Sequence, residues 1–464
     1  MNVCVIGGGP VGCAAAVVLR RLGYTVDIFE RYHDIRFVKP PSGRSINLVL
    51  TRRGLRLAED LGIAAELMAH TVEINGRMIH DLDGSTSYQP YGRTGECNYS
   101  IDRLVLNKFW LNQALKEGCR VFFDHTVSSL DVNTGVAHFI HDEGRSQSSV
   151  HLSNYSVAFA SDGAGSVVRG ALHAADLVTT SDSLLCAGYK EMVFPSNPDG
   201  SYSMDPHSLH IWARKEHMVM ALANTDGSFT GTLFMDRTSS DQDSLQSVSS
   251  SIESAKQFLE TQYPSAMKLM NQTDCVSNLV TFKEGVLGTV RCSPWAAQIG
   301  DQATPICLIG DASHAIVPFF GQGVNCGFED VFVLKQHLLS RHHPLSFESL
   351  RNYSIARKKD TDAIADLALE NFEEMRSRVA DESFLQMKKL DQKIMESFPN
   401  LYRTRYTLIM YTYNPYSVCK EIGDIQSKFL QELLDQFGDE LPPNLETLLR
   451  EQISPHIQRL AIEL

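Results

Sequence analysis

The stretch that decides the fold opens the chain: Val3-Cys4-Val5-Ile6-Gly7-Gly8-Gly9-Pro10-Val11-Gly12. Its first four residues predict a short buried strand, and the small, apolar residues at 12–22 predict a tightly packed helix. Residues 24–29 predict a second strand, which ends at Glu30. This order of strand, glycine turn, helix and strand is typical of a Rossmann-like sheet, so the sequence predicts an α/β fold.

The glycines of this turn have separate physical roles. Gly7 permits the tight turn, Gly9 lets the backbone approach a pyrophosphate, and Gly12 lets the helix pack closely on the strand. The helix N-terminus offers unpaired N–H groups and a positive dipole end to phosphates. Glu30 stands where an acid bonds the ribose hydroxyls of an adenosine. The segment predicts a bound dinucleotide, with a purely structural turn as the alternative.

The composition of the 464 residues narrows the class of protein. The hydrophobic fraction of 43% excludes a disordered chain, and the net charge of -13 argues against a nucleic-acid partner. The 10 cysteines form no CxxC pair and the 16 histidines no HExxH motif, so we expect a reduced protein without a metal site. No leader and no apolar run of the ~20 residues that span a bilayer is visible. We expect a soluble, cytoplasmic protein with no transmembrane segment.

The chain pattern predicts three parts. A helix over 101–118 and strands over 121–123, 150–160 and 306–309 continue the α/β pattern, in a discontinuous Rossmann-like domain of residues 1–74, 100–178 and 285–346. Alternating runs at 209–212, 218–223 and 230–235 predict an antiparallel sheet, in an inserted domain of residues 75–99 and 179–284. Residues 236–256 have the composition of an exposed connection. Residues 347–464 predict a helical C-terminal region.

Two further segments directly follow predicted strands. Asp162-Gly163-Ala164-Gly165-Ser166 fits a ligand loop, but an ordinary turn capped by the aspartate is the more economical interpretation. Gly310-Asp311 leads into Pro318-Phe319-Phe320-Gly321-Gln322-Gly323. Asp311 can accept hydrogen bonds from a ribityl chain, and the helix that follows Gly323 presents an N-terminus able to stabilise negative charge.

In this order and spacing, the three segments resemble the single-component, FAD-dependent aromatic hydroxylases. Within that group the match narrows to the kynurenine 3-monooxygenase family, over about residues 1–415. The blocks that carry this narrower resemblance are Gly43-Arg44-Ser45-Ile46-Asn47-Leu48, Arg77-Met78-Ile79-His80, Leu209-His210-Ile211-Trp212, 314–330 and 371–376. Small departures are Ser313, where the family has alanine, and Gly165, where an aromatic residue is frequent.

The resemblance implies an activity, its cofactor and its partners. The expected reaction is hydroxylation of L-kynurenine to 3-hydroxykynurenine with NADPH and O2, through a C4a-hydroperoxide of bound FAD. A sister hydroxylase for a substituted kynurenine or another aromatic acid, an oxidase that only releases peroxide, and a flavin-fold regulatory protein without turnover stay open. Oligomeric state, a homodimer included, also stays open. Animal members carry a membrane-anchoring tail after their C-terminal helices, so a mitochondrial outer-membrane location is the alternative to a cytoplasmic one.

The resemblance also assigns roles to residues of this sequence. No side chain is expected to act as a nucleophile, and Phe319, Phe320 and Gln322 would border the aromatic ring. Arg77 and Tyr91 would grip the substrate carboxylate, and Asn371 and Tyr406 would complete the amino-acid end. The cofactor would be held by Gly7, Gly9, Gly12, Glu30, Arg44, Arg103, Asp162, Asp311, Gly323, Val324 and Asn325. His314 has the better interpretation of a structural histidine, and Trp212 that of sheet core.

Overall fold

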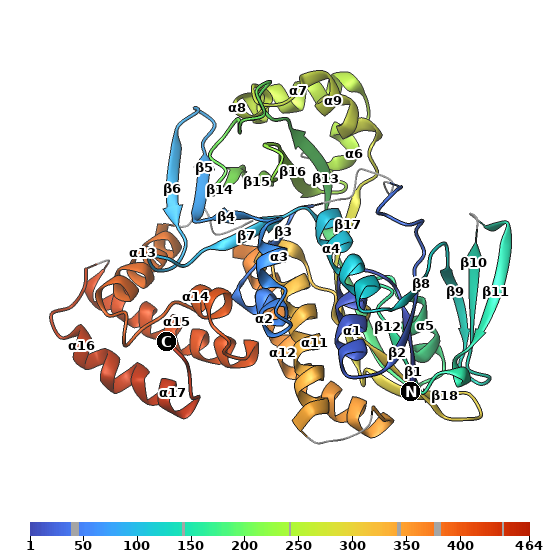
Figure 1. The fold of residues 1–464 in the computed structure, drawn as a ribbon. Helices are drawn as coiled ribbons and strands as arrows, with labels where there is room; N and C mark the ends of the chain where they lie inside the picture. The colour runs from blue at the N-terminus through green and yellow to red at the C-terminus, as the bar shows by residue number, and fades with distance from the viewer. Residues whose placement is uncertain (39–45, 142–143, 241–242, 341–344, 375–381, 439) are drawn as a thin grey trace.

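The computed structural model describes residues 1–38, 46–141, 144–240, 243–340, 345–374, 382–438 and 440–464. Figure 1 shows three parts: a Rossmann-like unit near the N-terminus, a second sheet above it with helices on its outer side, and C-terminal helices beside both. The α/β architecture with an antiparallel sheet and a helical C-terminal region is as the sequence predicts.

The Rossmann-like unit is built on a six-stranded sheet. Its order is β18 (Ala296–Ile299), β19 (Thr304–Leu308), β12 (Val157–Ala160), β1 (Asn2–Ile6), β2 (Thr25–Phe29) and β8 (Arg120–Phe122), parallel except for the β18–β19 pair. Helix α1 (Pro10–Arg21) contacts α4 (Arg103–Lys116) and α11 (Gly323–Ser340). Ala14, Ala15 and Ala16 are fully buried, because small side chains let these helices approach closely.

One predicted strand, over residues 150–160, proved to be two strands in different sheets. β11 (Ser146–His151) joins β10 (Val136–His141) and β9 (Thr126–Asp131) in a separate three-stranded sheet. A single helical turn over Leu152–Asn154 then leads into β12, whose four residues are all buried. The polar residues Ser153 and Asn154 lie at this break, in the helical turn that separates the two strands.

The second sheet has seven strands and covers the Rossmann-like unit. Its order is β17 (Gly285–Ser293), β13 (Thr179–Phe194), β16 (Phe229–Asp236), β15 (His217–Ala223), β14 (Ser208–Ala213), β5 (Gly76–His80) and β6 (Thr86–Pro90). Only the β14–β5 pair is parallel. Trp212 is fully buried in this sheet, as expected.

Helices pack on the outer face of the second sheet. They are α6 (Leu245–Val248), α7 (Ile252–Gln262), α8 (Pro264–Met267) and α9 (Gln272–Thr281). The prediction of an exposed connection over 236–256 was therefore wrong in part. Leu245 and Val248 are buried in the core shared with the sheet, and the many serines of this segment act as helix caps at Ser244 and Ser251.

A small sheet and short helices connect the two larger sheets. The strands are β3 (Leu48–Leu50), β7 (Asn98–Ile101) and β4 (Val72–Ile74), followed or flanked by α2 (Arg52–Asp60) and α3 (Ala64–Met68). Helix α5 (Val167–Ala174) follows β12, and α10 (Asp311–His314) and a turn over Pro318–Phe320 lead into α11.

The C-terminal helices close one side of the molecule. They are α12 (Phe347–Glu373), α13 (Glu382–Ser397), α14 (Arg405–Tyr411), α15 (Tyr416–Phe437), α16 (Leu445–Leu448) and α17 (Ser454–Arg459), with a wider helical turn over Leu449–Ile453. α12 and α14 share a core with the inner face of the second sheet. Tertiary packing against this core therefore holds the helices in register with the sheet.

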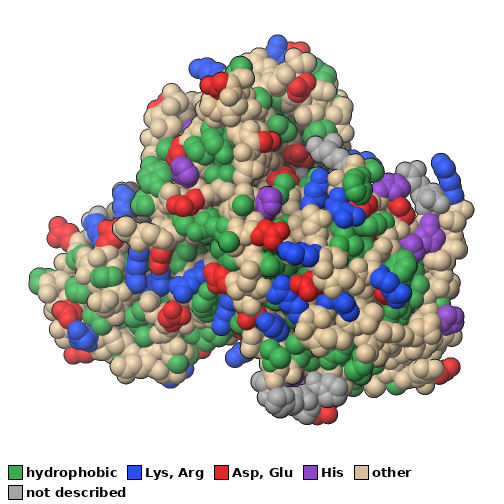
Figure 2. Space-filling view, in the orientation of Figure 1, with side chains coloured by type: hydrophobic (Ala, Val, Ile, Leu, Met, Phe, Trp, Pro, Cys, Tyr) green, Lys and Arg blue, Asp and Glu red, His purple; other side chains and the backbone are tan. Residues whose placement is uncertain are grey.

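The surface carries both signs of charge. Figure 2 shows Lys and Arg side chains interspersed with Asp and Glu over this face. Among the described residues, no helix combines the length and the apolar character needed to cross a membrane. All ten cysteines are free thiols, and Cys186 is the exposed one.

Candidate active site

The glycine turn after β1 forms one end of the site. Gly7 has φ +105°, and a Cβ there would lie 2.3 Å from the Ser161 carbonyl oxygen. A Cβ at Gly12 would lie 2.1 Å from the Gly7 oxygen, so these two positions require glycine for packing. Gly9 has open space beside it and lines the main cavity. The turn thus leaves backbone free to approach a ligand at Gly9.

Glu30 closes this end of the site from β2. One of its carboxylate oxygens accepts a hydrogen bond from the Gly8 N–H at 2.7 Å, and the other accepts from the Tyr32 N–H at 2.9 Å. The carboxylate is therefore fixed beside the glycine turn, with lone pairs left for hydroxyl donors. This is the placement that the acid of a dinucleotide site requires.

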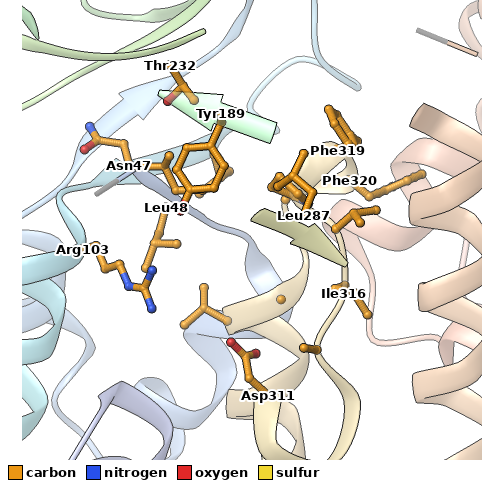
Figure 3. Close-up of a pocket in the computed structure, with 18 of the residues that line it drawn as sticks. Asn47, Leu48, Arg103, Tyr189, Thr232, Leu287, Asp311, Ile316, Phe319 and Phe320 are labelled. Carbon is orange, nitrogen blue, oxygen red and sulfur yellow. The ribbon is translucent and has the colours of Figure 1, made fainter. Parts of the chain in front are cut away.

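A cavity of about 650 Å³ runs from the glycine turn to the inner face of the second sheet. Arg103 of α4 and Asp311 of α10 line it near the Rossmann-like unit, while Phe319 and Phe320 line its other part (Figure 3). Tyr189, Thr232 and Leu287 reach it from the second sheet. A cavity this large, with backbone amides and a fork of guanidinium donors at one end, fits a dinucleotide that carries an aromatic ring system.

The start of α11 faces the same cavity. Gly323 and Val324 line it, and the first-turn N–H groups of a helix have no intrahelical acceptor. The Asn325 side chain is engaged elsewhere: its Oδ1 accepts from the Thr51 N–H at 3.0 Å, and its Nδ2 donates to the Val49 oxygen at 2.7 Å. Asn325 therefore braces the helix start against β3 and α2.

Asp162 is engaged within its own segment. Its carboxylate accepts from the Ser166 hydroxyl at 2.6 Å and from the Val168 N–H at 3.2 Å, which caps α5. Burial raises the pKa of Asp162, although these hydrogen bonds oppose the rise. The capped turn that the sequence favoured is present, while the adjoining Ser161, Gly163 and Gly165 line the cavity.

Arg77 of β5 dominates the opposite end of the cavity. Its Nε donates to the Tyr91 hydroxyl at 3.3 Å, and its guanidinium carbon lies 5.3 Å from the Tyr91 ring and 5.4 Å from the Tyr406 ring. Burial alone would lower the pKa of Arg77, but the neighbouring tyrosines raise it, so the group stays charged. Over the described parts of the chain, no carboxylate lies within 4.0 Å of this guanidinium. The positive charge is left for a ligand.

The aromatic residues of the site meet next to Arg77. Tyr91 and Tyr406 stack with ring centroids 5.6 Å apart, and Phe320 lies 6.0 Å from Tyr406. The ring centroid of Phe319 lies 4.6 Å from that of Phe372 and 5.4 Å from that of Phe234. These rings form an apolar wall of the cavity beside its charged end.

Two residues that the family resemblance places around the substrate do not line this cavity. Gln322 is fully buried behind it, where its Nε2 lies 3.0 Å from the Met410 sulfur and its Oε1 accepts from the Tyr416 hydroxyl at 2.7 Å. Asn371 donates from Nδ2 to the Phe319 oxygen at 2.6 Å. Both hold the aromatic segment 318–323 in place from outside the cavity. Arg44 falls outside the described residues.

A second cavity of about 1240 Å³ adjoins the Arg77 end. It lies between the second sheet and the C-terminal helices, and Asn371 lines it. Arg77, Tyr91, Phe320 and Tyr406 border both cavities. The charged end of the site thus lies between two hollows.

His314 belongs to a buried ionic network rather than to the cavity. Its Nε2 pairs with Asp330, and Arg357 pairs with Asp330 and with Glu329, each at 2.9 Å. Burial would lower the pKa of His314, but the Asp330 carboxylate raises it well above its usual range. Cys326 completes a possible ligand triad, yet an Arg357 nitrogen lies 3.7 Å from its sulfur. A metal cation there would face that positive charge, so the histidine is structural, as expected.

Sequence reasoning missed several residues that line the cavity. Thr232 comes from a predicted strand whose alternation showed only that one face is buried, whereas Asn98, Tyr189 and Leu287 come from β7, β13 and β17, which were not predicted. No motif marks them. Their place in the site depends on how the second sheet and β7 fold over the Rossmann-like unit.

The fold and this site define the class of protein. The family model described as FAD binding domain matches residues 1–368. Two solved structures share the fold: a 2-methyl-3-hydroxypyridine-5-carboxylic acid oxygenase (TM-score 0.62, 16% identity, 82% of this chain and 93% of that chain) and a tetracycline destructase (TM-score 0.57, 15% identity, 85% and 95%). The class is that of FAD-binding proteins with an aromatic-hydroxylase-like fold.

Curated relatives identify the family within that class. Kynurenine 3-monooxygenases from Flavobacterium psychrophilum (34% identity, 93% of this chain and 93% of the relative), Myxococcus xanthus (34%, 99% and 97%) and Xanthomonas campestris pv. campestris (35%, 93% and 91%) match nearly end to end. The chain belongs to the kynurenine 3-monooxygenase family.

Proposed function

We propose that this protein hydroxylates L-kynurenine to 3-hydroxykynurenine with NADPH and O2, using bound FAD. The observation that carries the proposal is the charged Arg77 guanidinium, which faces the cavity between two tyrosines and has no carboxylate partner among the described residues. A planar fork of donors matches a carboxylate in a way that a lysine ammonium does not. The substrate carboxylate supplies the missing partner.

The residues present fit FAD. Gly9 leaves room for the pyrophosphate at the start of α1, Glu30 stands ready for the adenosine ribose, and Asp311 lines the cavity where a ribityl chain would run. Arg103 and the first turn of α11 would stabilise negative charge on the ring system. When bound, FAD supplies the redox and oxygen chemistry of the reaction.

The protein contributes orientation and exclusion of water. Arg77, Tyr91 and Tyr406 would hold the amino-acid end of kynurenine, which directs its aromatic ring past Phe319 and Phe320 toward the flavin part of the cavity. Asn371, Gln322 and Asn325 act as positioning residues, since their hydrogen bonds hold segment 318–323 and α11. The phenylalanine wall keeps water from the reacting ring.

The domain roles follow from this assignment. We propose that residues 1–74, 100–178 and 285–346 hold FAD, that residues 75–99 and 179–284 cover the substrate, and that residues 347–464 close the amino-acid end. The strand β17 at the start of 285–346 belongs to the covering sheet, where it pairs with β13. No separate nicotinamide domain is assigned, so NADPH docks transiently at the cavity mouth. The ten free thiols favour a reducing, cytoplasmic location.

The test is oxidation of NADPH by the purified, FAD-loaded protein with and without L-kynurenine, with the product mass recorded. Stimulated oxidation and a product one oxygen heavier are expected. Stimulated oxidation that yields only peroxide would make kynurenine a mimic that uncouples the reaction. If another aromatic acid, but not kynurenine, stimulated NADPH oxidation, that acid would be the substrate. If no aromatic acid stimulated NADPH oxidation, the result would contradict the proposed hydroxylase activity.

A further inference from the structure

The side chain of Asn98 is buried in the site without a role in any motif. Asn98 is the first residue of β7 and is 1% exposed. Its Oδ1 has no hydrogen-bond partner among the described residues. The amide lies close enough to the Tyr406 hydroxyl to act on the pKa of that tyrosine, which burial raises and Asn98 and Arg77 lower. The amide thus lies beside the Tyr406 hydroxyl, and its Oδ1 is the buried acceptor left without a partner in the described parts of the chain.

Backbone pairing places Asn98 at the Arg77 end of the cavity. Asn98 stands opposite Ile74 in the β4–β7 ladder, and both residues line the cavity. The next residue along, Asn75, accepts a hydrogen bond from the Tyr91 N–H at 2.8 Å. Arg77 follows two residues later on β5. Asn98 thus lines the same end of the cavity as the two tyrosines and the guanidinium.

Among the described residues, the acids that line the main cavity lie away from Asn98 or are already paired. The acids that line it are Asp182, which pairs with Arg169 at 3.0 Å, and Asp311, which lies at the start of α10 near the glycine turn. An α-amino acid whose carboxylate binds Arg77 brings an ammonium group to the same end of the cavity. Neutral oxygens must accept its N–H groups, because a buried ammonium without acceptors is strongly disfavoured.

We propose that Asn98 is a specificity-determining residue whose Oδ1 accepts a hydrogen bond from the α-ammonium group of the substrate. Its Nδ2 at the same time holds the Tyr406 hydroxyl. The site would thereby distinguish an α-amino acid from the same acid that lacks the amino group. This inference rests on the proposed function, since it takes L-kynurenine as the ligand.

The test compares two ligands on the FAD-loaded protein. L-Kynurenine and 4-(2-aminophenyl)-4-oxobutanoate, its analogue without the α-amino group, are titrated while the flavin absorbance is followed. In Asn98→Leu, the dissociation constant of kynurenine should rise about 10- to 100-fold, as for a lost bond to a charged group, and that of the analogue less than about 3-fold. In Asn98→Asp, which keeps the shape and an acceptor oxygen, the preference for kynurenine should stay or grow.

Two controls separate this role from a structural one. Asn107 of α4 also has an unpartnered Oδ1 but does not line the cavity, so Asn107→Leu should leave both constants unchanged. Equal weakening of both ligands in Asn98→Leu, or lost preference in Asn98→Asp, would overturn the inference and leave the proposed function standing. If the unaltered protein responds to neither ligand, the proposed function itself has failed.

Discussion

The two ends of the main cavity are built in different ways. At the glycine turn, residues 9–11 of one contiguous segment line the cavity, and the absence of side chains at Gly7 and Gly12 allows this geometry. At the other end, side chains from β5, the segment after β6, β7 and α14 converge on Arg77. A binding site built from backbone atoms tolerates substitutions of nearby side chains, but it does not tolerate a Cβ added where the turn is tightly packed. A binding site built from side chains depends on the position of every helix and strand that carries one of those side chains.

The ends also differ in how their charges are satisfied. Glu30 is fixed by two backbone N–H groups, whereas Arg77 is held by a hydroxyl and two ring faces, and no described residue brings an opposite charge within 4.0 Å of it. The Glu30 carboxylate is held in place without a ligand. The Arg77 guanidinium gains an opposite charge from a ligand, so substitutions at Arg77 should affect binding more than folding.

The largest effect is expected where backbone packing forbids a side chain. Gly12→Val places a Cβ 2.1 Å from the Gly7 oxygen, so the turn must open. We expect loss of bound FAD and a destabilisation of about 3 kcal/mol or more, because overpacking is added to backbone strain. Flavin absorbance per chain and the thermal midpoint measure the two effects.

The matched control for Gly12 is Gly170→Ala. A Cβ at Gly170 of α5 meets nothing within 4 Å, so FAD content should stay unchanged. Full FAD content in Gly12→Val would break the comparison, since the turn would then tolerate a side chain.

The next effect is expected at the end built from side chains. Arg77→Ala should weaken kynurenine binding about 100-fold or more, as for the loss of a buried charge partner, while FAD stays bound. The loss should also remove kynurenine-stimulated oxidation of NADPH. Titration monitored by flavin absorbance gives the dissociation constant.

Arg77→Lys sharpens this result. It keeps the charge but loses the planar fork, so it should restore only part of the affinity. Equal loss of FAD and of substrate in either variant would show that the two ends of the cavity are not independent.

The smallest expected effect is a loss of folding stability at acidic pH. Burial and the nearby Arg214 hold the pKa of His217 at about 4 in the folded protein, and its Nδ1 lies 2.6 Å from the Tyr263 hydroxyl. Because the unfolded chain protonates this histidine near pH 6.5, the stability that its neutral form contributes is present above pH 6.5 and is lost as the pH falls toward 4.

The thermal midpoint should therefore fall between pH 6.5 and pH 4, and His217→Gln should flatten part of that fall. His80, whose pKa burial also lowers to about 4, contributes to the same fall. A variant with the same pH profile as the unaltered protein would contradict this origin of the acid sensitivity.

Elements with a strong local pattern were predictable. The strand, turn, helix and strand over residues 2–29 lie within two residues of their predicted bounds, as does the helix Arg103–Lys116. The helices α6 and α7 were not predicted, because serine-rich caps have the composition of a loop until a sheet is present for Leu245 and Val248 to cover.

The site residues show the same difference between those that a local motif predicts and those that depend on tertiary packing. Local motifs, each within one segment, were enough to predict the glycines, Glu30 and Asp311. In the structure, Gly9 and Asp311 line the cavity, and Glu30 accepts a hydrogen bond from the glycine turn. Gln322 lies behind the aromatic wall, since the Tyr416 hydroxyl binds its amide from a helix about ninety residues later in the chain.

The Rossmann-like start and the backbone cradle follow from local sequence alone, because they depend on hydrogen bonds and steric limits between near neighbours in the chain. Which side chains surround Arg77 depends on tertiary packing. It brought β5, β7 and α14 together and left Asn98 with a free acceptor. The physical reason is that burial, lost partners and shared cavities arise between elements distant in sequence, where no local pattern records them.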